Sequence, residues 1–145
     1  MTTTKTNESN KINKVAESRG YIKVKFGQVS PISLNYVHLG PIPQDGGIMR
    51  GSELGNDESK DFIQLTYPLK TVEGGPQVYN YPNDFEGMHA EWTYYKDEKY
   101  NVARSGKLTI TIETLGKTAK GEYSFITEDG INISGDFDLS PRIPD

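Results

Sequence analysis

The sequence predicts an all-β protein, an antiparallel β-sandwich or a closed barrel of about seven to nine strands. From Gly20 onward, apolar and polar residues alternate over several stretches, as they do in strands with one buried face. Nine Tyr and five Phe against three Met are more typical of strands than of a helical bundle. Fifteen Gly and eight Pro supply the turns that many short strands need.

Residues 1–19 are polar, and their composition predicts a disordered N-terminal arm. Residues 20–145 are predicted to form a single β domain, because a chain of 145 residues is large enough for one core. The arm has no apolar segment of the kind that marks a secretory signal, so the expected location is the cytoplasm, with the envelope or export as alternatives. No run of about 18 apolar residues is present, so no membrane span is expected.

The first predicted strands are "YIKVKF" at 21–26 and "ISLNYVHL" at 32–39. Strict alternation in the second places Tyr36 and His38 on the same face as Ile32 and Leu34. Residues 40–60 contain many glycines, prolines and acids, which predicts a long surface loop.

The middle of the chain contains three further predicted strands, "DFIQLTYPL", "QVYNY" and "MHAEWTYYK". In the last of these, Trp92 and Tyr94 share one face, whereas His89, Glu91 and Tyr95 lie on the other. Residues 97–106 are charged and are predicted to be a connector.

Three strands, at 107–114, 119–127 and 131–139, are predicted to close the chain as a meander. A loop at 128–130 sets each aromatic of one strand over a glycine of the other, and the predicted pairs are Phe125 with Ile133, Tyr123 with Gly135, and Gly121 with Phe137. A four-residue loop, 115–118, sets Ile112 opposite Gly121, Ile110 opposite Tyr123 and Leu108 opposite Phe125. One face of the meander is then apolar and the other polar.

The segment "SGKLTITIETLGKTAKGEYSFITEDGINISGDFDLSP" also resembles the closing part of small uncharacterised bacterial β domains, often lipoproteins. Their pattern reads G-x-(I/V/L)-T-I-T, then G-x-F-x-F, then G-x-F-D, and "GPQVYNY" and "AEWTYYKDEKY" extend the likeness over 60–145. The resemblance implies an antiparallel, lipocalin-like barrel or sandwich with no assigned activity. This chain departs from those lipoproteins because it has no cysteine to carry a lipid.

Charge and composition exclude several classes of function. A net charge of −4 with scattered lysines argues against nucleic-acid binding, which needs a basic surface. Without cysteine there are no disulfides, thiol nucleophiles or cysteine-bound zinc. The two histidines and the acidic loops show no metal-ligand spacing, so no metal and no cofactor are expected.

The residues that suit a ligand site lie in the aromatic-rich segment 79–100, where rings alternate with amides and acids. The candidates for ligand binding are Tyr79, Tyr81, His89, Glu91, Trp92, Tyr94 and Tyr95. The competing interpretation assigns about half of these rings to the hydrophobic core.

The sequence therefore predicts a non-enzymatic binding module for a partner protein or for an amphiphilic or saccharide ligand. One alternative is a lipocalin-like carrier that holds a small molecule inside a barrel. A third is a small enzyme with His89 and Glu91 as its acid/base pair. An open sheet edge would also let two copies pair as a homodimer.

Overall fold

The computed structural model describes residues 18–42, 46–53, 61–68, 70–85, 87, 91–113 and 118–141. Within these ranges lie ten strands and one short 3-10 helix. They are β1 (Ser18–Phe26), β2 (Ile32–Leu34), β3 (Tyr36–Ile42), β4 (Gly46–Ser52), β5 (Phe62–Tyr67), β6 (Gly74–Tyr81), η1 (Asn83–Phe85), β7 (Thr93–Lys96), β8 (Lys99–Glu113), β9 (Thr118–Thr127) and β10 (Asn132–Pro141). The first strand begins two residues before the predicted domain boundary, and residues 1–17 of the predicted arm lie outside the described ranges.

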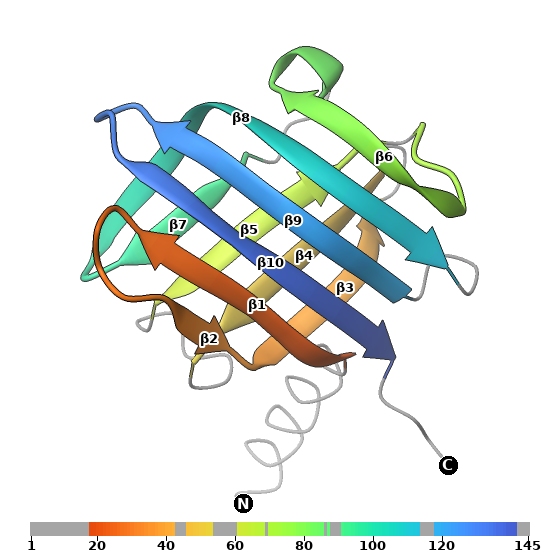
Figure 1. The fold of residues 1–145 in the computed structure, drawn as a ribbon, viewed down its shortest axis with the longest axis horizontal. Coiled ribbons are helices and arrows are strands. Elements are labelled where there is room, and N and C mark those ends of the chain that lie inside the picture. Colours follow the sequence, from red (N-terminus) through yellow and green to blue (C-terminus); the bar gives the residue numbers. More distant parts are fainter. Residues whose placement is uncertain are drawn as a thin grey trace, which may run out of the picture.

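Eight strands form a closed antiparallel barrel, in the order β10-β9-β8-β7-β5-β4-β3-β1 (Figure 1). The barrel closes because β1 pairs with β10, from Ser18↔Pro141 to Phe26↔Ile133. Two strands are additional: β2 extends the β3 side of β1, and β6 pairs with β8. The prediction of an antiparallel β fold is confirmed, and of its two forms the barrel is the one observed.

The C-terminal meander forms as predicted between β9 and β10. The observed pairs include Phe125↔Ile133, Tyr123↔Gly135 and Gly121↔Phe137. The apolar face of the meander points into the barrel, where Tyr123, Phe125, Ile133 and Phe137 are all buried.

The pairing of β8 with β9 differs from the prediction by two residues. Ile110 lies opposite Gly121, Leu108 opposite Tyr123 and Gly106 opposite Phe125. A shift of two keeps every side chain on its predicted face, because the side-chain period of a strand is two. The observed register also gives Phe125 a glycine partner: a Cβ at Gly106 would stand 2.6 Å from Phe125 Cβ and 2.9 Å from Trp92 Cζ3.

Two predictions about residues 32–60 are wrong. The backbone breaks at Asn35, between β2 and β3, and the alternation changes phase there, so Val37 is buried in place of Tyr36 and His38. The supposed loop 40–60 contains β4, whose glycines make close contacts, since a Cβ at Gly47 would stand 2.1 Å from the Tyr67 ring. The part of that loop at 54–60 lies outside the described residues.

The predicted connector 97–106 is also wrong, because most of it is strand. Asp97 and Glu98 form a two-residue turn, with positive φ angles of 53° and 65°, that joins β7 directly to β8. Such turns are usually marked by Asn-Gly or Asp-Gly, and this one has neither.

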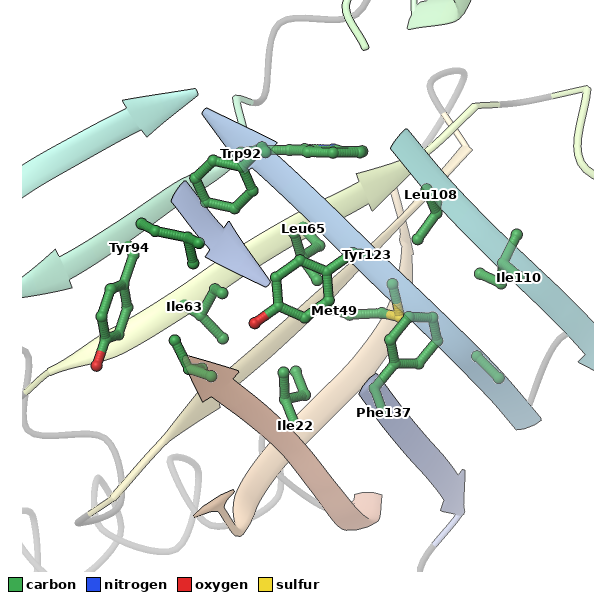
Figure 2. Packing of buried hydrophobic residues seen from close by; sticks show 14 of the residues in the cluster. Ile22, Met49, Ile63, Leu65, Trp92, Tyr94, Leu108, Ile110, Tyr123 and Phe137 are labelled. Atoms are coloured by element: carbon green, nitrogen blue, oxygen red, sulfur yellow. The ribbon is translucent and has the colours of Figure 1, made fainter. Parts of the chain in front are cut away.

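The core fills the barrel interior (Figure 2). Side chains from opposite walls meet there, including Ile22, Met49, Ile63, Leu108 and Phe137, all of them buried. An eight-stranded barrel has an interior just wide enough for such side chains to occupy it. The hydrophobic core therefore lies inside the barrel, and polar residues alternate on its outer surface.

The strand β6 has a second edge that does not pair with β8, and this edge is partly blocked. The backbone N–H of Asn80 donates to Asp84 Oδ2 at 2.7 Å instead of to a strand. Pro76, four residues earlier in β6, has no N–H to offer to any strand. Between them lies Val78, whose side chain is 52% exposed. The proline and the bonded N–H of β6 oppose the addition of another strand.

We expect Asp84→Ala to make the protein self-associate at high concentration. The variant frees the Asn80 N–H beside exposed Val78, which restores a pairing edge. Analytical ultracentrifugation over a concentration series measures the effect. Asp84 also lies 3.6 Å from Lys70 Nζ, so Lys70→Ala is the matched control that removes the ion pair and keeps the bonded N–H. Equal sedimentation of Asp84→Ala and wild type would show that Asp84 does not protect this edge.

Candidate functional site

Four of the predicted ligand-binding rings pack within the fold. Trp92 and Tyr94 are fully buried, Tyr79 is buried and Tyr81 is half-buried. Tyr81 stacks on Trp92 with ring centroids 4.5 Å apart, and Phe85 of η1 meets both rings edge-on. The Trp92 Nε1–H donates to the carbonyl oxygen and to the hydroxyl of Thr66, both at 3.2 Å. The four rings therefore pack against other side chains of the fold.

This aromatic cluster has a structural cause in the shape of β8. The first part of β8 pairs with β7, but from Gly106 onward its partner on that side is β6. The strand β5 pairs with β7 only through residues 62–64. Trp92 precedes β7 and bonds to Thr66, in the part of β5 that has no β7 partner. It therefore fills the space where the two partners of β8 diverge.

The predicted acid/base pair is only half described. His89 lies outside the described residues, and Glu91 is an exposed residue just before β7. The backbone carbonyl of Glu91 accepts a hydrogen bond from Gln64 Nε2 at 2.9 Å. An enzymatic role for His89 and Glu91 stays a prediction of the sequence.

Tyr95 is the predicted ligand-binding ring that reaches the outer surface, and two other aromatic rings lie beside it there. The register places Phe62 of β5 opposite Tyr95 of β7, and Tyr95 opposite Tyr100 of β8. Their ring centroids are 5.4 and 4.7 Å apart, close to the spacing of adjacent strands. Tyr100 is 63% exposed. We call Phe62, Tyr95 and Tyr100 the outer aromatic row.

Arg50 of β4 extends the outer aromatic row by one position. Its guanidinium carbon lies 4.6 Å from the centroid of the Phe62 ring, which is a cation–π contact. The outer aromatic row and Arg50 together thus run across four strands. The Arg50 cation lies at one end and the exposed phenol of Tyr100 at the other.

Charged side chains of both signs gather where β7 turns into β8. Lys96 Nζ lies 3.7 Å from Asp61 and 3.8 Å from Asp97, and Lys99 Nζ lies 2.7 Å from Asp129. The exposed Lys99–Asp129 pair contributes little to stability, about 0–1 kcal/mol, whereas Lys96 and Asp61 are half-buried. Lys96 and Lys99 are direct cross-strand partners that alternate with Tyr95 and Tyr100, so these pairs lie at the end of the barrel and not on the face of the row.

The hydroxyl of Tyr95 stays neutral at ordinary pH. Desolvation raises its pKa, and the neighbouring Tyr100, Glu98 and Asp61 raise it further. A neutral phenol both donates and accepts hydrogen bonds, so it can bond to a polar partner of either kind.

Sequence reasoning found Tyr95 but left Arg50 and Phe62 out of the predicted site. Neither residue is close to Tyr95 in the chain, and only the pairing of β4, β5 and β7 brings them together. An Asn-Gly or Asp-Gly pair at 97–98 would have indicated a tight hairpin turn, and that turn would have placed Tyr100 beside Tyr95. The chain has Asp97 and Glu98 there instead.

Comparisons with known proteins do not assign this site. No protein-family model, curated protein or solved structure matches the chain. Among the described residues, no helix is long and apolar enough for a membrane span. In the same part of the chain, no three His, Asp or Glu side chains gather as metal ligands.

Proposed function

We propose that the protein is a non-enzymatic binding module that recognises a partner protein through the outer aromatic row. The observation that carries the proposal is the line of half-buried Phe62 and Tyr95 and exposed Tyr100, with Arg50 stacked at its end. Tyr and Arg are among the residues that contribute most to binding energy at protein interfaces.

The filled interior favours the outer face, and not the inside of the barrel, as the place of the binding site. A carrier would need room for its ligand among the inward-facing residues. Here those positions hold large buried side chains, including Trp92, Tyr94, Phe125 and Phe137. On the outer aromatic row, in contrast, Tyr100 is 63% exposed and keeps its ring available to a partner.

A peptide-display selection on the folded protein tests the proposal. We expect the selected peptides to bind Tyr100→Ser or Phe62→Ser about thirtyfold more weakly than wild type, because loss of a central aromatic contact costs about 2 kcal/mol. Isothermal titration calorimetry measures each affinity. Val78→Ser is the matched control, since it removes a similarly exposed apolar side chain from β6 and should leave binding unchanged.

Two outcomes contradict the proposal in different ways. Peptides that bind both row variants as tightly as wild type would locate recognition elsewhere. A glycan array tests the saccharide alternative: glycans that bind wild type but not Tyr100→Ser, with no selected peptide, would make the row a saccharide site.

A further inference from the structure

A second surface feature lies on the other side of the barrel, on the outer face of β8, β9 and β10. It is a hollow of about 660 Å³ whose side-chain lining is polar. The polar side chains are Lys107, Thr109, Glu122, Ser124, Ser134 and Asp136. This volume is within the range of about 300–1,000 Å³ that small-molecule sites occupy.

The register of the three strands explains why the surface is hollow there. Ser124 and Ser134 are direct cross-strand partners, and their short side chains form a low floor. Longer side chains stand at both ends of this row, because Lys107 pairs with Ser124 and Lys25 of β1 pairs with Ser134. The neighbouring row of Thr109, Glu122 and Asp136 forms one wall.

The opposed carboxylates of this wall are a further sign of a site. Glu122 and Asp136 are directly opposite each other on adjacent strands, an arrangement of like charges that destabilises a sheet. The Tyr21 hydroxyl donates to Asp136 Oδ2 at 3.3 Å and holds that carboxylate from the β1 side. Within the described residues, Glu122 has no such donor, so its acceptor oxygens stay open to the hollow.

The chemistry of the lining selects the class of ligand. The two carboxylates and the serine hydroxyls accept hydrogen bonds, whereas the hydroxyls and the Lys107 ammonium also donate them. The carboxylates disfavour an anion, and the largely polar lining favours a polar ligand over an apolar one. A neutral ligand with several adjacent hydroxyl groups can use donors and acceptors together.

We infer that this hollow binds a neutral mono- or disaccharide. The site is separate from the outer aromatic row, since its residues come from the outer face of β8, β9 and β10 and share none with Phe62, Tyr95 or Tyr100. The inference therefore does not depend on the proposed protein partner. It adds a small-molecule site on another face of the barrel.

Two-dimensional ¹H–¹⁵N NMR titration with glucose, galactose, N-acetylglucosamine, maltose and cellobiose tests the inference. We expect at least one of them to shift the amide signals of Glu122, Ser124 and Ser134. Glu122→Gln keeps the shape but removes a charged acceptor, which should weaken binding about tenfold. Ser134→Val fills the floor and should abolish binding. Glu113→Gln, an exposed residue of β8 outside the hollow lining, is the control and should bind as wild type does.

The inference is overturned if none of the five sugars shifts these signals at tens of millimolar. It is also overturned if binding is equal in wild type, Glu122→Gln and Ser134→Val. If the sugar shifted the amide signals of Phe62, Tyr95 and Tyr100 and not those of the hollow, the inference would also be overturned. The saccharide would then be assigned to the outer aromatic row. Since all three variants alter outward-facing residues, their spectra should show the wild-type fold.

Discussion

Trp92→Ala should lower the free energy of unfolding by about 4 kcal/mol, which is a large part of the total for a domain of this size. Trp92 is fully buried and contacts the rings of Tyr81, Phe85 and Phe125. Alanine leaves a cavity where the partners of β8 diverge. It also leaves the buried Thr66 carbonyl and hydroxyl without their donor.

Urea denaturation followed by far-ultraviolet circular dichroism measures this effect, because the variant removes the chain's one tryptophan as a fluorescent probe. Trp92→Phe should lose about 2 kcal/mol, since it retains most of the packing and loses the hydrogen bonds. Tyr100→Ala is the surface control and should cost at most about 1 kcal/mol, the value of a cross-strand pair. A Trp92→Ala protein within 1 kcal/mol of wild type would contradict a packing role. In that case Trp92 and Tyr81 would again be candidates for a ligand site.

The parts of the fold that could be predicted from sequence are those with local signals. The meander could be placed because its alternation is regular and Gly130 marks the hairpin loop between β9 and β10. The strand β4 could not be predicted, since Gly47 is explained only by Tyr67 of the next strand and Gly51 only by Ile22 and Leu34 of β1 and β2. The phase change at Asn35 has no sequence signature either.

The candidate site shows the same division between local and distant information. Alternation correctly separated Trp92 and Tyr94 on the inner face from Tyr95 on the outer one. Whether an inner ring lines a cavity or fills the core depends on the opposite walls of the barrel, which alternation does not reveal. The outer aromatic row depends on the registers of β4, β5, β7 and β8 together. Because the residues of this row come from several strands, the alternation pattern within each strand could not reveal it.

The glycine at 135 has a specific role at the closure of the barrel. The Tyr123 hydroxyl of β9 passes over Gly135 of β10 and donates to the Lys23 carbonyl of β1 at 2.8 Å. Pairing between β1 and β10 is interrupted at this place, between Ile22↔Phe137 and Lys25↔Ser134. One tyrosine thus connects three strands, and burial raises the pKa of its hydroxyl well above the usual value, which keeps it a donor.

Gly135→Ala should therefore destabilise the protein by about 3 kcal/mol, from overpacking and from loss of this hydrogen bond. An added Cβ would stand 1.8 Å from the Lys23 oxygen and 2.9 Å from the Tyr123 oxygen, so β1 must move away from β10. Urea denaturation gives the magnitude, and faster amide hydrogen exchange confined to β1 and β10 would locate it. Tyr123→Phe should cost only about 1 kcal/mol, since it removes the hydrogen bond and keeps the ring.

Gly130→Ala separates the closure effect from the general cost of replacing a glycine. Its φ is +84° and an added Cβ would meet nothing within 4 Å, so it should cost only the left-handed backbone strain of about 1 kcal/mol. If Gly135→Ala proved no more harmful than Gly130→Ala, the contact between Gly135 and Lys23 would not limit the approach of β1 to β10. If it is more harmful by about 2 kcal/mol, the aromatic-over-glycine pair does more than bend the sheet. It lets a side chain of one strand reach the backbone two strands away, at the point where the barrel closes.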